Sequence, residues 1–220
     1  MELKLSARPA DLPRLRHALH EIAPDAASGE QRLLSTYYDT PELLLKKRAL
    51  TLRVREQSGR FIQTVKAGDP AGADILSRGE WEDPLDGDRP QLEAPESGPH
   101  LPQEIGEGLR PLFVTKVTRT VADIEPSPGT VVEAAIDEGE IRVADGDGSE
   151  PIAELELELK SGDAAALYDT ALRLLEAAPI RIETRSKSER GYRLAERGRA
   201  IPREVSEEEY RRRVISKSVG

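Results

Sequence analysis

The chain has 220 residues, 37% of them hydrophobic and 33% charged, which predicts one domain with a modest core and a highly charged surface. It contains no cysteine, which excludes disulfides and thiolate metal sites and is typical of a reducing compartment. The net charge of −9 argues against broad nucleic-acid binding, which needs a basic surface, but not against a small polyanion held in a basic cavity.

Alternating and helical patterns along the chain predict many strands and few helices. Apolar residues at helical spacing predict helices over 11–22 and from 163 onward, and Thr40-Pro41 predicts the start of a short helix through Leu45. Turn residues predict a hairpin at Ser58-Gly59 and a second turn at Glu138-Gly139. Strands are expected over 1–5, 33–38, 49–57, 60–67, 78–82, 114–124, 131–137, 140–144, 152–160 and 180–187.

Two segments are expected to lie outside this sheet. Residues 83–102 are rich in proline, glycine and acidic residues, which is typical of an exposed loop. Ser206-Glu207-Glu208-Glu209 is a capping box and predicts a short charged helix. The predicted organisation is therefore a domain over 1–200 followed by a charged helical tail or linker over 201–220.

The predicted elements indicate an α+β fold that is mainly β. Many strands meet in hairpins, and an open sheet of this kind would leave reactive edges. We therefore expect a closed antiparallel eight-stranded β-barrel with flanking helices. The amino-terminal segment lacks the apolar core of a signal sequence, and no apolar run approaches a membrane span, so a cytoplasmic location without membrane contact is expected.

Several strands alternate apolar residues with charged ones. Arg53 and Arg55 flank Val54, and Glu154, Glu156 and Glu158 alternate with leucines. Residues i and i+2 share one face of a strand, so each such strand has a charged face and an apolar face. A single strand of this kind is usually half exposed to solvent. Like charges in file repel, however, and files of opposite sign on several strands favour an enclosed channel with an acidic and a basic wall.

Such a channel suits a metal–phosphate ligand. Carboxylate oxygens are the ligands that Mg²⁺ and Mn²⁺ prefer, and arginine and lysine bind phosphate oxygens. The sequence therefore favours a polyphosphate site with divalent metal.

Motifs in chain order carry a resemblance to a known family. They are Met1-Glu2-Leu3-Lys4, Tyr37-Tyr38-Asp39-Thr40, Ala49 to Arg55, Thr64-Val65-Lys66, Arg78-Gly79-Glu80-Trp81-Glu82, Arg119, Asp137-Glu138-Gly139, Glu154 to Glu158, and Ser186 to Tyr192. In this order they resemble the CYTH domain of the triphosphate tunnel metalloenzyme superfamily. They are most similar to bacterial inorganic triphosphatases in which a CHAD domain follows, so a longer native chain with that domain is possible. The family's opening motif has one further glutamate, which would fall before Met1.

The charge files and the resemblance together imply the following site. Triphosphate would be held by Lys4, Arg53, Arg55, Lys66, Arg119, Arg185 and Lys187. Mg²⁺ or Mn²⁺ would be held by Glu2, Glu80, Glu82, Asp137, Glu154, Glu156 and Glu158. Glu154, Glu156, Lys4 and Arg53 would be catalytic.

The implied activity is metal-dependent hydrolysis of tripolyphosphate to pyrophosphate and phosphate. The alternatives are a thiamine triphosphatase and a CYTH-type adenylate cyclase, although aromatic residues make up only 4% of the chain, which disfavours adenine binding. An alternative from another class is a module that binds polyphosphate and turns it over slowly.

Overall fold

The fold is a single antiparallel sheet with helices on both faces. The computed structural model describes residues 1–24, 29–68, 79–93, 101, 103–106 and 108–200. Within them the strand order is β5-β4-β3-β2-β6-β7-β8-β1-β9. The strands are β1 (Glu2–Ser6), β2 (Gly29–Asp39), β3 (Leu50–Gln57), β4 (Arg60–Ala67), β5 (Gly79–Leu85), β6 (Arg110–Ser127), β7 (Thr130–Val143), β8 (Ser149–Ser161) and β9 (Arg181–Ile182). The α-helices are α1 (Leu12–Ile22), α2 (Leu44–Lys47), α3 (Ala165–Ala177) and α4 (Lys187–Ala200).

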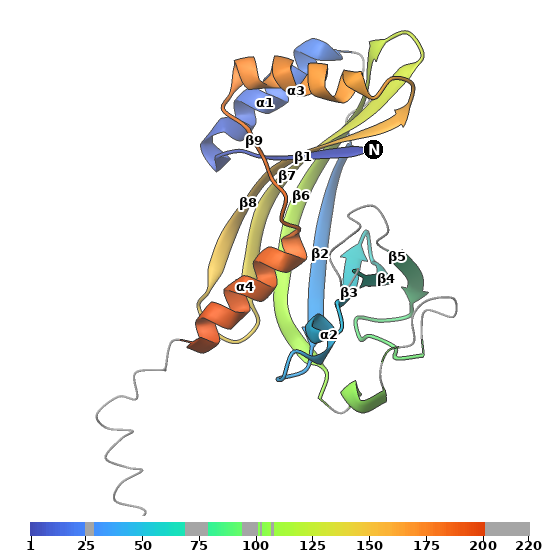
Figure 1. Ribbon diagram of the computed structural model, residues 1–220, viewed down its shortest axis with the longest axis vertical. Coiled ribbons are helices and arrows are strands. Elements are labelled where there is room, and N and C mark those ends of the chain that lie inside the picture. The colour runs from blue at the N-terminus through green and yellow to red at the C-terminus, as the bar shows by residue number, and fades with distance from the viewer. Residues whose placement is uncertain (25–28, 69–78, 94–100, 102, 107, 201–220) are drawn as a thin grey trace, which may run out of the picture.

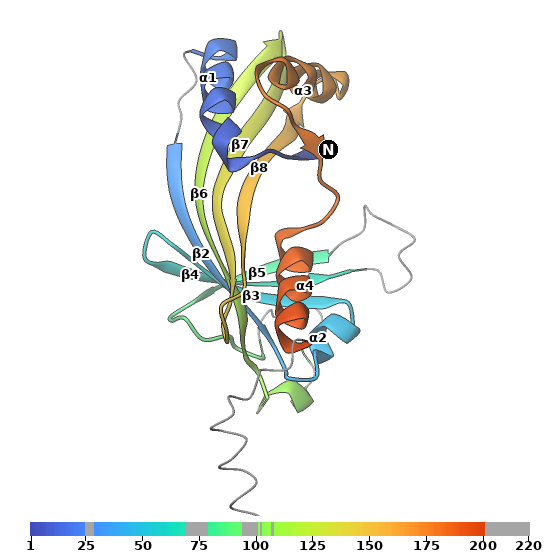
Figure 2. The ribbon, with the colours of Figure 1, turned by 90° about the vertical axis from the view of Figure 1, so that its left-hand side faces the viewer.

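The sheet is strongly bent, and its two faces carry different helices (Figure 1). In Figure 2 the long strands β6–β8 run vertically, and the shorter strands β3–β5 lie across their lower part. Helices α1 and α3 pack on one face, where Leu155 and Leu157 of β8 lie in the core. Helix α4 packs on the other face, against Phe113 of β6 and Ile152 of β8. Because alternate residues of β8 point to opposite faces, its glutamates share the face of α4.

The predicted hairpin at Ser58-Gly59 is confirmed. Gln57 pairs with Arg60, so the connection has two residues. Both have positive φ, 52° at Ser58 and 76° at Gly59, as in a type I′ turn, whose twist matches that of the strands. This turn fixes the register that places Arg53 opposite Thr64.

The predicted closed eight-stranded barrel is wrong, because the sheet has nine strands and stays open. In the described part of the chain, β5 pairs only with β4, and β9 only with β1. The predicted strand 180–187 is reduced to the two residues of β9, after which the chain leaves the sheet and enters α4. A helix packed into the bend thus takes the place of a closing strand. The fold remains α+β and mainly β.

The predicted turn at Glu138-Gly139 is also wrong, because β7 runs through it without interruption. Gly139 lies so close to β6 that a Cβ atom there would meet the carbonyl oxygen of Lys116 at 1.9 Å. The glycine therefore serves close strand contact instead of a turn.

The predicted loop 83–102 begins later than expected, since β5 extends to Leu85. Residues 94–100 and 102 of that loop, Arg78 at the start of the predicted strand, and the predicted tail 201–220 with its capping box lie outside the described residues.

Helix α4 begins at a capping box that the sequence carries. The Ser186 backbone N–H donates to Glu189 Oε2 at 2.6 Å, and the Glu189 N–H donates to Ser186 Oγ at 3.1 Å. Gly191 then allows the helix to lie against the sheet, because a Cβ atom there would stand 2.2 Å from the Phe113 ring. The cap and the glycine together bring Lys187 and Arg190 onto the charged face of β7 and β8.

Candidate functional site

The charged residues of the sheet meet in one cavity of about 950 Å³ on the face of α4. Strands β1–β8 and the start of α4 contribute to its lining. The predicted site residues that line it are Glu2, Lys4, Arg53, Arg55, Lys66, Glu80, Glu82, Arg119, Asp137, Glu156 and Lys187.

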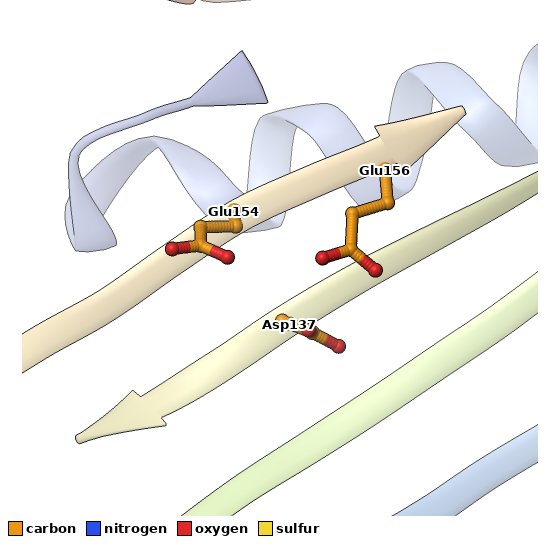
Figure 3. A group of neighbouring side chains, drawn as sticks. All are labelled: Asp137, Glu154 and Glu156. Atoms are coloured by element: carbon orange, nitrogen blue, oxygen red, sulfur yellow. The ribbon is translucent and has the colours of Figure 1, made fainter. Parts of the chain in front are cut away.

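Three carboxylates form an acidic cluster on neighbouring strands (Figure 3). We use this name for Asp137 of β7 with Glu154 and Glu156 of β8. Asp137 pairs with Glu154 across the two strands, and one oxygen from each of the three residues lies within 4.8 Å of the others. Hard oxygen donors at this spacing suit a divalent metal ion, so the residues present fit one.

Two cations of the cavity lining hold the acidic cluster. Lys187 Nζ lies 2.8 Å from Asp137 Oδ2, 2.5 Å from Glu154 Oε2 and 2.9 Å from Glu156 Oε1. Arg119 binds both oxygens of Asp137, at 2.7 and 2.8 Å, and reaches Glu156 Oε2 at 2.5 Å. The cluster is therefore charge-compensated by side chains.

These contacts outweigh burial in setting the charge states. Burial alone would raise the pKa of Asp137, but the hydrogen bonds from Arg119 and the charge of Lys187 lower it. The pKa of Glu156 is likewise lowered, against burial, by Lys187 and Arg119. Burial would lower the pKa of Lys187, yet Asp137, Glu156 and Glu154 raise it. Asp137, Glu156 and Lys187 therefore stay charged near neutral pH.

Arg190 of α4 is a site residue that the prediction missed. Its side chain is buried and donates through Nη1 to Glu154 Oε1, through Nε to Glu150 Oε1 at 2.7 Å, and through Nη2 to the Pro151 carbonyl at 2.6 Å. The sequence signal that could have identified it is the capping box Ser186-x-x-Glu189, which marks the start of a helix. Lys187 and Arg190 are three residues apart, so they share one face of that helix.

The opposite side of the cavity is basic, with a looser set of partners. Arg53 Nη2 lies 3.5 Å from Glu80 Oε1 and 3.4 Å from Glu82 Oε1, while Lys66 Nζ lies 2.8 Å from Glu80 Oε2. Glu82 also accepts a hydrogen bond from Thr64 at 3.0 Å. Glu80 and Glu82 keep 42% and 49% of their side-chain area exposed, so solvent weakens these pairs.

Arg55 has no carboxylate partner among the described residues of the cavity. Its Nε donates to Ser35 Oγ at 3.3 Å, and no carboxylate of the described chain lies within ion-pair distance of it. Burial and the neighbouring charge of Arg53 lower its pKa. Arg53 Nε is buried and has no hydrogen-bond partner among the described residues. These two guanidinium groups would be stabilised by an anion.

Strand β1 contributes one residue of each charge. Lys4 Nζ donates to the Arg185 carbonyl, and its pKa is lowered mainly by burial. Glu2 has a raised pKa because of burial and the nearby charge of Glu156. Both side chains line the cavity next to the acidic cluster.

Three predicted residues lie outside the cavity lining. Glu158 is half exposed and pairs with Lys160 Nζ at 2.8 Å, because it lies one step beyond Glu156 toward the end of β8. The Arg185 side chain binds Glu183 through two hydrogen bonds of 3.1 and 3.0 Å, and only its carbonyl oxygen faces Lys4. Glu154 is not in the lining either, but it is buried directly behind Lys187.

The tyrosine rings beside the cavity are engaged in the core. Tyr37 stacks on Phe113 at a centroid distance of 4.5 Å, and Tyr192 packs edge-on against the same ring at 5.5 Å. The Tyr192 hydroxyl donates to Asp39 Oδ2 at 3.0 Å. Asp39 also accepts the backbone N–H groups of Thr40, Leu45 and Lys46, and it thereby stabilises the turn between β2 and α2.

Within the described residues, no helix is both long and apolar enough to cross a membrane.

Comparison with known proteins agrees with this architecture. An inorganic triphosphatase of Haemophilus influenzae is 32% identical over 161 residues, which are 73% of this chain and 45% of that protein. The chain thus spans about half the length of this curated relative.

Two solved structures share the fold. A candidate adenylate cyclase of Bacillus halodurans superposes with a TM-score of 0.53 at 21% identity, covering 86% of this chain and 95% of its own. A candidate adenylyl cyclase of Hippeastrum, reported to have a dominant triphosphatase activity, gives 0.54 at 16% identity over 90% of this chain and 95% of its own. The family model of the CYTH domain matches residues 1–192, and the chain therefore belongs to the CYTH domain family.

Proposed function

We propose that this chain is a metal-dependent inorganic triphosphatase that releases phosphate from tripolyphosphate. The observation that carries the proposal is a pair of arginines in the cavity lining. Arg53 is buried and has an unsatisfied Nε, and Arg55 is half-buried and has no carboxylate partner in the described chain. A polyanion supplies what both lack. The resemblance to an inorganic triphosphatase supports the same substrate class.

In this proposal the basic residues bind and orient the phosphates. Arg53, Arg55 and Lys66 hold one end of the chain of phosphates, and Lys4, Arg119 and Lys187 lie toward the other end, beside the acidic cluster. Positioned cations stabilise the charge that develops on phosphate oxygens during transfer. Arg185 is proposed to contribute only through its carbonyl oxygen, which fixes Lys4.

The acidic residues are proposed to hold Mg²⁺ or Mn²⁺. Asp137, Glu154 and Glu156 are the central ligands. Glu2, Glu80 and Glu82 line the same cavity and would assist them, whereas Glu158 lies outside the lining. When bound, such an ion neutralises phosphate oxygens and lowers the pKa of a coordinated water. Arg119 and Arg190 keep the carboxylates in position.

The engagement of the tyrosines favours inorganic triphosphate over nucleotide or thiamine esters. A base or thiazole ring binds best on an exposed aromatic face. Tyr37 and Tyr192 are the aromatic residues in the described cavity lining, and both pack on Phe113. Tripolyphosphate needs no such surface.

The test is phosphate release from tripolyphosphate, ATP and thiamine triphosphate with Mg²⁺, Mn²⁺ or EDTA. We expect tripolyphosphate to be cleaved fastest and EDTA to abolish release. Arg53→Ala and Glu156→Gln should each lose most of the activity, about 100-fold or more, because each removes a charge that faces the transition state. Arg142→Ala and Glu140→Gln are the matched controls, since these two residues pair with each other at 3.1 Å and do not line the cavity. Near-normal rates of phosphate release in both Arg53→Ala and Glu156→Gln would contradict the proposal.

A further inference from the structure

We infer that Lys187 is an exchangeable counter-ion of the acidic cluster, which makes tight metal binding depend on triphosphate. Lys187 must leave the three carboxylates before a divalent ion binds them, and the bound polyanion gives it a second partner. The identity of that polyanion rests on the proposed function, whereas the competition between Lys187 and metal does not.

The first argument is the position of the ammonium group. Lys187 Nζ contacts one oxygen of each of the three carboxylates, at 2.5 to 2.9 Å. Three oxygens that converge on one cation are also the donor set that suits a divalent ion. An ammonium and a metal ion cannot share that point, because both are cations and both need contact with the same oxygens.

The second argument is what holds the remaining oxygens. Asp137 Oδ1 and Glu156 Oε2 accept hydrogen bonds from Arg119 at 2.7 and 2.5 Å. Glu154 Oε1 accepts one from Arg190. An arginine therefore holds the second oxygen of every member. Asp137 Oδ2, which faces Lys187, also accepts a hydrogen bond from Arg119 at 2.8 Å, so the cluster would take up an ion mainly through the Glu154 and Glu156 oxygens that face Lys187.

The third argument concerns charge. The cluster carries three negative charges, and Lys187, Arg119 and Arg190 supply three positive ones. A divalent ion added to this neutral group would meet Lys187 at close range. A polyanion in the cavity removes this obstacle, because the flexible lysine stem can turn its ammonium to phosphate oxygens.

Lys187 is suited to such movement, and the two arginines are not. A lysine binds as a point charge through a long flexible side chain, whereas Arg119 is fixed by two parallel hydrogen bonds to Asp137. Lys187 also stands at the first position of α4 and lines the cavity. Since coupling between two ligands is reciprocal, metal should equally strengthen triphosphate binding.

The test is a titration with Mn²⁺ in the absence of any phosphate, followed by electron paramagnetic resonance of free Mn²⁺. Lys187→Met should bind Mn²⁺ at least about tenfold more tightly than the wild type, since one close positive charge is gone. Lys116→Met is the control, because it also removes one positive charge but from an exposed position on the opposite face of β6. Equal affinities of wild type and Lys187→Met, or an equal gain in both variants, would overturn the inference.

A second arm uses a triphosphate analogue with imido bridges, which resists hydrolysis. Because the analogue itself attracts Mn²⁺, the informative quantity is the ratio of Mn²⁺ affinities with and without it. We expect this ratio to be several-fold smaller in Lys187→Met than in the wild type, and an undiminished ratio would contradict the link to triphosphate.

The folding of the variant also has a defined outcome. Removing Lys187 leaves a surplus of negative charge in the acidic cluster, so the melting temperature of Lys187→Met should be lower than that of the wild type. Mn²⁺ should raise the melting temperature of Lys187→Met more than that of the wild type. If Mn²⁺ fails to restore a destabilised Lys187→Met, the inference is wrong. A wild type that releases no phosphate from tripolyphosphate would refute the proposed function alone, because the first titration contains no phosphate.

Discussion

The acidic and the basic side of the cavity are compensated in opposite ways. Every carboxylate of the acidic cluster contacts Lys187 and an arginine, and most of these contacts are buried. On the basic side, Arg53 and Lys66 share half-exposed glutamates, and Arg55 contacts only a serine hydroxyl among its described partners. The acidic side is therefore a prearranged, neutral structural unit, while the basic side has positive charge available for a ligand.

This difference predicts which substitutions affect stability and which affect activity. A buried charge that loses its partner costs several kcal/mol, whereas a buried charge that lacks a partner already costs little to remove. Removing a cation from the acidic side should therefore lower the free energy of unfolding, whereas removing one from the basic side should change it little.

The largest effect is expected for Arg190→Met. This change removes the Arg190 contacts of Glu150 and of the fully buried Glu154, which keeps only Lys187 among its described cation partners. It should lower the free energy of unfolding by about 3–5 kcal/mol. Urea unfolding followed by circular dichroism measures it. Arg193→Met is the matched control: Arg193 lies in the same helix, meets Glu150 at 3.5 Å and is 38% exposed, so its loss should cost less than about 1 kcal/mol. Similar unfolding midpoints for the two variants would contradict the comparison.

Arg55→Met should separate activity from stability. Phosphate release from tripolyphosphate should fall about 100-fold, because a cation that faces the substrate is lost. The free energy of unfolding should change by less than about 1 kcal/mol, since Arg55 has no carboxylate partner in the described structure and is repelled by Arg53.

Arg119→Met is the counterpart of this variant on the acidic side. It deprives Asp137 and Glu156 of hydrogen bonds and should lower stability as well as activity. If Arg55→Met were the less stable of the two variants, the proposed difference between the two sides would be reversed.

Most residues of this site could be predicted from the sequence, but the open shape of the sheet around it could not. Alternation placed Arg53 with Arg55 and Glu154 with Glu156 on shared faces, because the two-residue period of a strand is local information. Lys187 was predicted to lie in the strand 180–187, because the capping box that Ser186 forms with Glu189 was not recognised. Whether a sheet closes depends on pairing between distant edges, which no local pattern encodes, and the open sheet with α4 in its bend was therefore missed.

Glu158 and Arg185 show the same limit at the level of single residues. Both have the correct face or parity, yet each binds a neighbour two positions away, Lys160 and Glu183. The alternation of side chains predicts the face of a strand on which a residue lies. Whether that face still borders the cavity depends on the position of the residue along the strand. Arg190 was missed because its role depends on where α4 meets β8, which is a contact between segments far apart in the sequence.

The smallest effect is expected at the attachment of α4, which carries Lys187 and Arg190 to the acidic side. Tyr192→Phe removes the hydroxyl that donates to Asp39 Oδ2 and keeps the ring against Phe113. Asp39 retains three backbone N–H donors, so the free energy of unfolding should fall by only about 1 kcal/mol. Tyr168→Phe on α3, where the side chain is 56% exposed, is the matched control and should change stability by less than about 0.5 kcal/mol. A loss in Tyr192→Phe as large as that in Arg190→Met would mean that the hydroxyl, and not the ion pairs of α4, fastens this helix over the cavity.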